Sequence, residues 1–327
     1  TNQVKDEVKK MFGLDKDDPV NQVGVTDMRS VKEECEGKQV AVYYAYGSIV
    51  DNPVTGSMFG AEHMIVGSEV CKDLEALAED DDVKAVVLRI NSGGGSAYAS
   101  EQMWNQVEQL KKKKPVVVSM GDMAASGGYY MGCNANWIVA QPTTLTGSIG
   151  IFAMIPDMSQ LLTQKLGIKF DEVKTNKNST FGSSARPLNA EEIGYLVRYI
   201  DRGYALFRQR VADGRKLSVN QVEAIAQGHV FVGRDALKIK LVDELGGLNK
   251  AVEKAAKLAK LDEFYTQDYP AKASWMDQLT GAMSGGNYLD EQLRATLGEY
   301  YEPFMLLKTM NQQNMIQARI PFYLNIR

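Results

Sequence analysis

The sequence predicts an α/β protein built on a mostly parallel sheet, and three consecutive segments carry this prediction. Val83–Ile90 and Val116–Val118 are almost wholly apolar, which is typical of strands covered on both faces. Between them, Ala97–Lys111 repeats apolar residues at helical spacing. A strand, a helix and a second strand within about 35 residues form a right-handed crossover between parallel strands. The chain should therefore fold as a series of such βαβ units.

The same alternation continues on both sides of this unit. Val40–Tyr46 is the first strong strand, and Ser68–Glu79 places its apolar residues on one helical stripe. A long helix is expected at Ala190–Ala212, and its predicted core-facing residues are Ile193, Leu196, Val197, Ile200, Tyr204, Phe207 and Val211. The other expected elements are a helix from Ser126, strands at Trp137–Ala140 and Lys169–Val173, and helices at Asp157–Leu166, Val219–Gln227, Arg234–Lys240 and Leu248–Ala259.

Composition divides the chain into three parts. Residues 1–37 are polar and charged, and we expect them to be a linker or the trailing end of a preceding domain. Residues 38–262 hold the alternating strands and helices and form the predicted main domain. Residues 263–327 are rich in Met and aromatic side chains, which predicts a helical or irregular appendage that packs on a neighbouring subunit.

Charge and cysteine content bound the function. The 327-residue chain has a net charge of −4, so nucleic acid is not expected as its main ligand. Cys35, Cys71 and Cys133 are widely spaced and form no CxxC pair, which argues against a disulfide framework and a zinc site. No apolar run approaches the roughly 20 residues that span a bilayer. We therefore expect no metal, no cofactor and no membrane-spanning segment in this chain.

Two glycine-rich segments carry the chemistry. Arg89–Ser96 and Ser119–Tyr130 each follow a predicted strand and lead into a predicted helix. The second lifts the hydroxyl of Ser126 onto a helix N-terminus, where unpaired N–H groups gather. Gly127 then offers one N–H to a developing oxyanion, and Gly93–Gly95 can offer another, because the missing side chains let the loop approach. A serine that faces two N–H groups is the minimum equipment for acyl transfer.

Two features leave this pattern incomplete. Ser126 could simply cap the helix, and the Gly-x-Ser-x-Gly elbow of α/β-hydrolases is not met, because Ala124 takes the first glycine position. The base is also missing, since neither His63 nor His229 has a motif that aims it at the serine. A lysine held neutral by burial is the remaining solution, which would make a serine–lysine dyad.

Five motifs occur together between residues 83 and 247: Val83–Ser96, Met123–Tyr129, Leu145–Ile151, Ile225–Ala236 and Leu241–Gly247. Jointly they resemble the signal peptide peptidase A (protease IV) family, peptidase family S49, over roughly residues 38–262. The resemblance implies a Clp-protease/crotonase-like fold, a spiral of βαβ units. It also implies a serine endopeptidase that degrades cleaved signal peptides at the extracytoplasmic face of the bacterial inner membrane.

Carried over position by position, the resemblance implies roles for single residues. Ser126 becomes the nucleophile, and Gly94 and Gly127 supply the N–H groups of the oxyanion hole. Peptides would bind as extended chains in a cleft lined by the remaining loop glycines, Gly93, Gly95 and Gly128. The resemblance further implies homo-oligomerisation.

The resemblance departs at the position of the base. In short members of the family the lysine falls in the loop after Phe170–Lys174, where this chain has Ser179, and Lys174 and Lys177 are out of register. Long members have two tandem copies of the domain, with the serine in the second and the lysine in the first. The chain is therefore expected to be the second copy of the long form. A missing N-terminal half would supply the lysine and the membrane anchor.

Two other functions compete with the peptidase. A crotonase-type acyl-CoA enzyme would use the same N–H pair to hold a thioester enolate, and Asp122 is the one acid beside the loops. A catalytically incomplete scaffold, or pseudoprotease, would present the cleft without chemistry. Binding of coenzyme A would favour the first alternative, and the absence of Ser126-dependent labelling would favour the second.

Overall fold

The computed structural model describes residues 37–52, 64–155, 157–183 and 186–270, together with residues 9, 13, 296–297, 301 and 316–319. Contacts between Cα atoms divide the chain into two units, Thr1–Glu36 and Gly37–Arg327. All helices and strands below belong to the second unit. The expected linker, residues 1–37, therefore lies almost wholly outside the described residues.

The larger of two sheets has eight strands. Their order is β10-β8-β6-β4-β1-β12, and β7 and β11 branch from β6. All described pairs in this sheet are parallel except that of β8 with β10. The strands are β1 (Lys38–Tyr46), β4 (Val83–Ser92), β6 (Val116–Ala125), β7 (Trp137–Ala140), β8 (Leu145–Gly147), β10 (Val230–Val232), β11 (Glu244–Leu245) and β12 (Phe264–Tyr269). The predicted mostly parallel α/β architecture is confirmed.

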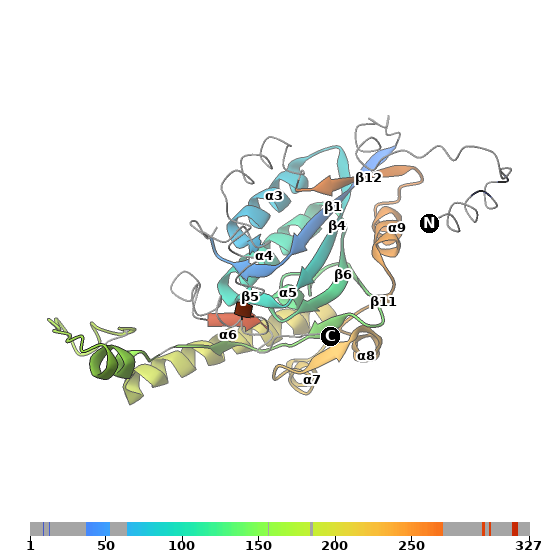
Figure 1. Cartoon of the computed structure of the whole chain (residues 1–327). Coiled ribbons are helices and arrows are strands. Elements are labelled where there is room, and N and C mark those ends of the chain that lie inside the picture. Colours follow the sequence, from blue (N-terminus) through green and yellow to red (C-terminus); the bar gives the residue numbers. More distant parts are fainter. Residues whose placement is uncertain are drawn as a thin grey trace, which may run out of the picture. The chain divides into compact units, whose positions relative to one another are not determined.

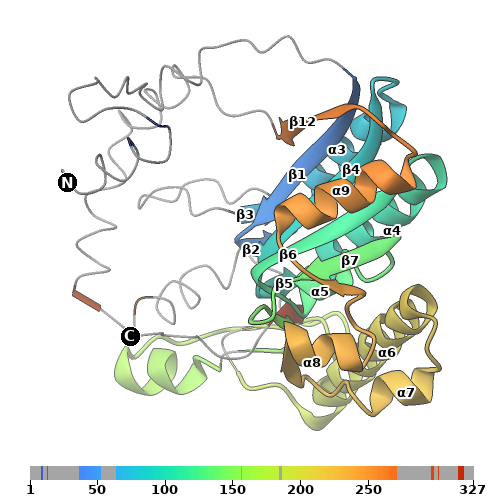
Figure 2. The same cartoon turned by 90° about the vertical axis from the view of Figure 1, so that its right-hand side faces the viewer.

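Helices cover both faces of this sheet, as Figure 2 shows: α3 (Gly67–Glu79) and α4 (Ala97–Lys113) lie on one face and α9 (Leu248–Leu258) on the other. Side chains alternate along a strand, so β1 turns Ala41 toward the first face and Val40 toward the second. Burial on both faces explains why β4 and β6 are continuous apolar runs in the sequence. We call these three layers the body.

A second sheet of five short strands begins where β4 ends. Its order is β3-β2-β5-β13-β9. The strands are β2 (Ser48–Val50), β3 (Met64–Val66), β5 (Gly94–Ser96), β9 (Phe152–Ala153) and β13 (Ile316–Arg319). In Figure 1, β13 is the short red strand beside β5. The first glycine-rich segment and residues 316–319 are therefore in the same sheet.

Helix α5 (Gly127–Tyr130) is a single turn held in place by its two buried tyrosines. The Tyr129 hydroxyl donates to the Leu241 carbonyl at 3.0 Å, and the Tyr130 hydroxyl donates to the Glu101 carboxylate at 2.6 Å. The Tyr130 ring also stacks on Phe207, with the ring centroids 4.1 Å apart. These contacts fix the turn that precedes α5, and they confirm the predicted helix start at Ser126.

The segment 151–206, green to yellow in Figure 1, is organised differently, and we call it the arm. The strand predicted at Lys169–Val173 is wrong, because the described backbone there has no regular structure. The helix predicted over Asp157–Leu166 is reduced to a short π-helix, η1 (Leu161–Lys165). Phe170 and Val173, the apolar residues of the run Lys169–Val173, are both exposed.

The long helix α6 (Ala190–Arg215) joins the arm to the body. Its predicted length is nearly right, but its buried stripe is not continuous. Phe207 and Val211 are fully buried, whereas Ile193 and Val197 are exposed, so the predicted core-facing stripe is wrong for the first half of the helix. Two shorter helices follow at the predicted places, α7 (Val219–Glu223) and α8 (Gly233–Lys238).

The segment expected to be a helical or irregular appendage, residues 263–327, begins with a strand. Residues 264–269 form β12, which adds to the edge of the body by pairing in parallel with β1. Apart from this strand, Pro270, residues 296–297 and 301, and β13, the appendage lies outside the described residues. The predicted limits of the main domain, 38 and 262, stay predictions.

Candidate functional site

The two glycine-rich segments meet at the end of the parallel sheet. A Cβ placed on Gly127 would lie 3.2 Å from the Cα of Gly94 and 2.6 Å from the hydroxyl oxygen of Ser100. A Cβ on Gly128 would lie 2.7 Å from the carbonyl oxygen of Ser92. These distances leave no room for a side chain, so glycine is what allows the segments to touch. The structure thus brings the first loop beside Ser126, as the sequence analysis expected.

Ser126 occupies a strained turn between β6 and α5. Its backbone has φ 53° and ψ −117°, a conformation that side-chain-bearing residues rarely adopt. Its N–H donates to the Gly147 carbonyl at 2.8 Å, which ties the turn to the end of β8. Such a strand-to-helix turn presents a nucleophile in hydrolases. The missing first glycine of the elbow motif, replaced by Ala124, has not prevented this geometry.

The Ser126 hydroxyl is buried and without a partner. Ser126 is 0% exposed, and among the described residues no group hydrogen-bonds its Oγ. A capping serine would accept a hydrogen bond from a backbone N–H of the first helical turn, and α5 has no such side-chain cap. An unmade buried hydrogen bond costs about 1 to 3 kcal/mol. The simple capping role therefore does not account for Ser126.

The two proposed oxyanion donors differ in their availability. Gly94 has φ 98°, and its N–H donates to the Ser92 hydroxyl at 3.1 Å. That hydroxyl in turn donates to the Gly47 carbonyl at 2.7 Å. Gly127 is the first residue of α5, so its N–H has no partner within the helix. Gly127 can therefore serve an oxyanion directly, whereas the Gly94 N–H must first leave Ser92.

A second strained serine lies beside Ser126. Because β6 and β8 pair in parallel with Ala125 opposite Gly147, Ser126 and Ser148 follow at the same edge of the sheet. Ser148 is buried, has φ 49°, and donates its N–H to the His229 carbonyl at 2.7 Å. In the sequence, Ser148 is visible only as part of the motif Leu145–Ile151. A positive φ at a serine leaves no mark in a single sequence, so nothing singled it out.

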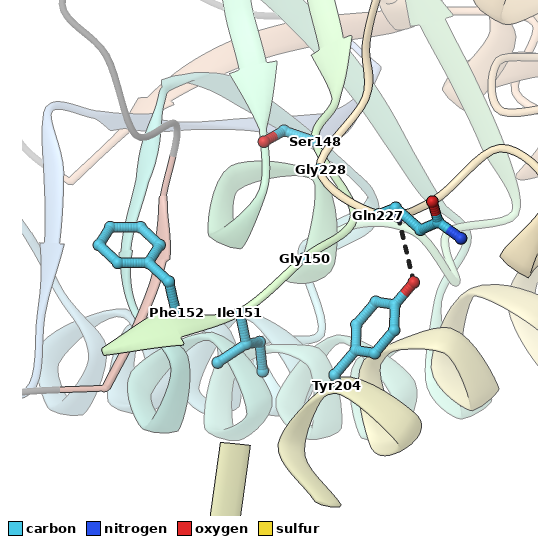
Figure 3. A pocket seen from close by; sticks show the side chains of 7 residues that line it. All are labelled: Ser148, Gly150, Ile151, Phe152, Tyr204, Gln227 and Gly228. Atoms are coloured by element: carbon cyan, nitrogen blue, oxygen red, sulfur yellow. Dashed lines mark hydrogen bonds between the residues drawn. The ribbon is translucent and has the colours of Figure 1, made fainter. Parts of the chain in front are cut away.

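Ser148 opens onto a pocket of about 380 Å³, which Figure 3 shows. Its lining residues are Ser148, Gly150, Ile151, Phe152, Tyr204, Gln227 and Gly228. The Tyr204 hydroxyl accepts from the Gln227 N–H at 3.1 Å and donates to the Glu223 carboxylate at 2.9 Å. The lining contains no lysine or histidine. The pocket is thus a space beside the candidate nucleophile without a base of its own among the described residues.

Of the two histidines, only His229 lies among the described residues, and its ring has another partner. His229 points Nδ1 at the Ala226 carbonyl, 2.7 Å away. His63 lies outside the described residues. Neither histidine therefore provides a described partner for the Ser126 hydroxyl.

Lys174 and Lys177, the arm lysines near the position expected for the base, are unsuited to act as bases in this conformation. Lys177 is exposed, and its hydrogen-bonded ion pair with Glu191 raises the pKa of its ammonium group. Lys174 pairs with Glu172, and Ser179, at the position expected for the base, is exposed. A lysine base must be neutral, which requires a lowered pKa. The pKa of Lys177 moves in the opposite direction.

Other chemistry would require different groups among the described residues. They contain no cluster of three or more His, Cys, Asp or Glu side chains that could hold a metal ion. Asp122, the acid that a crotonase-type reaction would use, is exposed. Within this part of the chain, no helix has the length and apolar character needed to cross a membrane.

A serine on a strained strand-to-helix turn, at the end of a parallel α/β sheet and beside a glycine loop, defines the class of serine hydrolases. Comparison with known sequences then gives the family. Residues 108–262 match the family model of Peptidase family S49, and residues 60–143 match that of Clp protease. These matches support a serine peptidase of the S49 type with a Clp-protease-like α/β fold.

Relatives are similar to this chain over part of their own length. Protease 4 of Salmonella typhi is 38% identical over 283 residues, which is 86% of this chain and 44% of that protein. The chloroplastic serine protease SPPA of Arabidopsis thaliana is 35% identical over 260 residues, 78% of this chain and 38% of that protein. Among solved structures, a ClpP1 point mutant from Listeria monocytogenes aligns with a TM-score of 0.42 at 14% identity, covering 64% of this chain and 94% of that one. The chain spans less than half the length of the first two relatives.

Proposed function

We propose that this chain carries the nucleophile of a serine peptidase, with Ser126 as the attacking residue. One observation carries the proposal: the Ser126 hydroxyl is held on a strained turn, fully buried and unpartnered, next to the contact between Gly94 and Gly127. The backbone strain at Ser126 and the missing hydrogen bond of its hydroxyl both have an explanation if a base and a substrate bind next to it. No structural role of Ser126 offsets it.

In this mechanism Ser126 Oγ attacks the carbonyl carbon of the scissile peptide bond while a base removes its proton. The oxyanion that forms accepts a hydrogen bond from the Gly127 N–H, joined by Gly94 once its N–H turns away from Ser92. The base then protonates the leaving amine as the C–N bond breaks. Water hydrolyses the acyl-enzyme by the reverse sequence and restores Ser126.

The base in this proposal is a lysine from outside residues 37–270. The pocket lined by Ser148 offers it a place, because Ser148 follows β8 at the sheet edge where Ser126 follows β6, and the lining is mainly apolar. Burial in such surroundings lowers the pKa of a lysine and makes it neutral. The long form of the family, in which a preceding half supplies the lysine, is the source we favour. Lys177 and Lys174 are the in-chain alternatives.

The proposed substrates are peptides bound as extended strands, in particular remnants of signal peptides at the extracytoplasmic face of the bacterial inner membrane. This finer assignment comes from the resemblance to signal peptide peptidase A. The names of the relatives, Protease 4 and serine protease SPPA, support the coarser assignment, which is proteolysis.

We also infer that the chain forms a homo-oligomer, and the exposed apolar residues of the arm support this. Phe170 is 45% exposed and Val173 is 94% exposed, although both are of a kind that usually lies buried. Sedimentation velocity of wild type and Val173→Asp tests the inference. A lower mass for the variant, with an unchanged circular dichroism spectrum, is the expected result. Equal masses for wild type and Val173→Asp would mean that Val173 is not part of a contact between subunits.

Labelling with a fluorophosphonate probe tests the peptidase proposal. The chain is labelled alone and after mixing with a polypeptide carrying the N-terminal half expected of the long form, with Ser126→Ala and the exposed arm variant Ser179→Ala as matched controls. We expect labelling only in the mixture, lost in Ser126→Ala and kept in Ser179→Ala. Labelling of the chain alone would move the base to Lys177. The absence of Ser126-dependent labelling in every sample would favour the scaffold.

A further inference from the structure

Residues 316–319 occupy a position that a peptide substrate would need. β13 is antiparallel to β5 on one side and to β9 on the other, and it stands between them in the sheet. Neighbouring strands in a sheet lie about 4.8 Å apart. β5 and β9 therefore flank a position one strand wide, which we call the middle position. Backbone groups of both flanking strands are available to whichever extended chain lies there.

The register of β13 relates it to Ser126. Ala318 lies opposite Gly95, and Arg319 lies opposite Gly94. The carbonyl oxygen of Ala318 lies 2.7 Å from the place where a Cβ on Gly127 would be. The peptide group between Ala318 and Arg319 therefore passes both glycines that the proposed mechanism uses. A substrate carbonyl about to be attacked would need the same neighbourhood.

Burial closes the site around this segment. Ala318 and Ser126 are both 0% exposed. The Ala318 side chain is enclosed, because Ala318 has no exposed surface and its partner Gly95 is buried as well. The middle position therefore accepts a methyl group at residue 318 and has no described space for a large side chain. An incoming peptide cannot reach Ser126 until β13 leaves.

We propose that residues 316–319 are a tethered occupant of the peptide-binding position, held in a substrate-like register and displaced by the peptides on which the site acts. The inference rests on the proposed function, since it treats the middle position as the substrate site. Because the segment belongs to the same chain, it competes with incoming peptides at an effective concentration that does not depend on the protein concentration. Peptides that bind more weakly than the segment are then excluded, so β13 sets an affinity threshold for entry.

Peptide binding provides the first test. The probe is a fluorescein-labelled octapeptide of residues 313–320, Gln-Asn-Met-Ile-Gln-Ala-Arg-Ile, followed by anisotropy. Ala318→Trp in the full chain should expel β13, because the enclosed position cannot take an indole, and Ala224→Trp at an exposed position is the matched control. We expect the Ala318→Trp chain to bind the probe at least tenfold more tightly than wild type and Ala224→Trp. Equal affinity in all three chains would overturn the proposal.

Disulfide formation provides a second test that does not depend on a probe. Ile316 lies directly opposite Ala153 in the antiparallel pair, at a Cα separation that a disulfide spans. The full chain carrying Ala153→Cys and Ile316→Cys should form this link within one molecule on mild oxidation, as read by peptide mass spectrometry. Ala153→Cys with Gln317→Cys is the register control, because adjacent strand residues face opposite sides. Its link should form at least tenfold more slowly.

A link only between two chains would identify a second copy as the occupant and overturn the tethered arrangement, as would equal linking in the register control. Neither test needs a chemical step, so adding Ser126→Ala should leave both results unchanged. Linking and peptide exclusion without any Ser126-dependent labelling would therefore reject the peptidase while keeping the occupant. Ser126-dependent labelling without the disulfide link would reject the tethered occupant while keeping the peptidase.

Discussion

The body and the arm use similar apolar side chains in opposite ways. In the body, helices cover both faces of the sheet, and residues such as Val86, Leu110 and Val118 are 0% exposed. In the arm, large apolar side chains face outward: Met154, Met158, Leu161, Leu166, Ile168, Phe170, Val173, Phe181, Ile193, Tyr195, Val197, Tyr199 and Leu206. The body is complete within one chain, whereas the arm has the composition of a surface that meets a partner. A periodic apolar pattern thus indicates that a face is covered without indicating what covers it.

The largest contrast is expected from the same truncation made in each region. Leu110→Ala removes a fully buried side chain of α4 from the core and should lower the free energy of unfolding by about 2 to 5 kcal/mol. Leu161→Ala removes an arm side chain that is 46% exposed and should cost less than about 0.5 kcal/mol. Urea unfolding of both variants, followed by circular dichroism, measures the two values.

Equal losses in the free energy of unfolding for Leu110→Ala and Leu161→Ala, at a protein concentration where the chain is monomeric, would contradict the contrast between body and arm. That outcome would mean that the arm has a core of its own. If Leu161→Ala becomes costly only as concentration rises, the arm is stabilised by association, as a partner-covered surface requires.

A glycine-to-alanine pair sharpens the contrast at the level of function. In Gly127→Ala the new Cβ would meet the Ser100 hydroxyl, the Ala318 carbonyl and Gly94 at 2.6 to 3.2 Å. We expect about a hundredfold loss in the rate of fluorophosphonate labelling in the complemented chain, comparable to loss of an oxyanion donor. Gly194→Ala in α6 meets only the end of the Arg198 side chain at 3.4 Å. It should label normally and gain about 0.5 to 1 kcal/mol in stability.

Labelling of Gly127→Ala at the wild-type rate would show that the contact between the two loops is dispensable, and it would remove Gly127 from the oxyanion hole. Equal losses in both variants would instead point to a general effect of the substitution on folding. The unfolding curve of Gly194→Ala distinguishes these cases, because a general effect on folding would lower the stability of this variant as well.

Most of the body could be predicted because its signals are local. Val83–Ile90 and Val116–Val118 are apolar throughout, since helices cover both faces of β4 and β6, and the helix between them has a clean stripe. The turn at Ser126 was located by its small neighbours. Its positive φ was not foreseen, nor was that of Ser148, because no residue type at either position signals it.

The rest could not be predicted, because it depends on partners distant in the chain. β12 has mixed polarity and becomes a strand only through β1, more than 220 residues earlier by their numbering, as in the pair Lys38 and Phe264. β13 likewise depends on β5 and β9. In the arm, the run at Lys169–Val173 looked like a strand, yet no described strand pairs with it. The position of the base stays open for the same reason, since no local pattern marks it.

The junction between body and arm offers a smaller, more specific test. The Tyr130 hydroxyl and the Arg210 guanidinium both donate to the Glu101 carboxylate, each at 2.6 Å, and Tyr130 stacks on Phe207 of α6. Tyr130→Phe keeps the stacking and removes one hydrogen bond to a charged group. We expect a loss of about 1.5 kcal/mol in the free energy of unfolding. An unchanged stability would show that Arg210 alone satisfies Glu101.

The smallest effect is expected from acid at the start of α6, where the arm has its own buried carboxylate. Glu192 accepts hydrogen bonds from the Arg186 guanidinium at 2.7 Å and from the Asn189 N–H at 2.9 Å. The bond to Arg186 is the main cause that lowers the pKa of Glu192 from 4.5 to about 2. The unfolded chain therefore binds a proton at higher pH than the folded one. The stabilisation is fully present above about pH 4.5, and it is lost as the pH falls toward 2.

Hydrogen exchange between pH 6 and pH 2.5, expressed as protection relative to the free peptide rate, measures this loss. We expect a several-fold drop in protection over the first turns of α6, with a smaller change in α4 of the body. Glu192→Gln cannot ionise, so its α6 protection should be lower at pH 6 and should change little with pH. A drop in Glu192→Gln equal to that of wild type would assign the acid sensitivity to another group, and the arm would then owe its local order to contacts other than this ion pair.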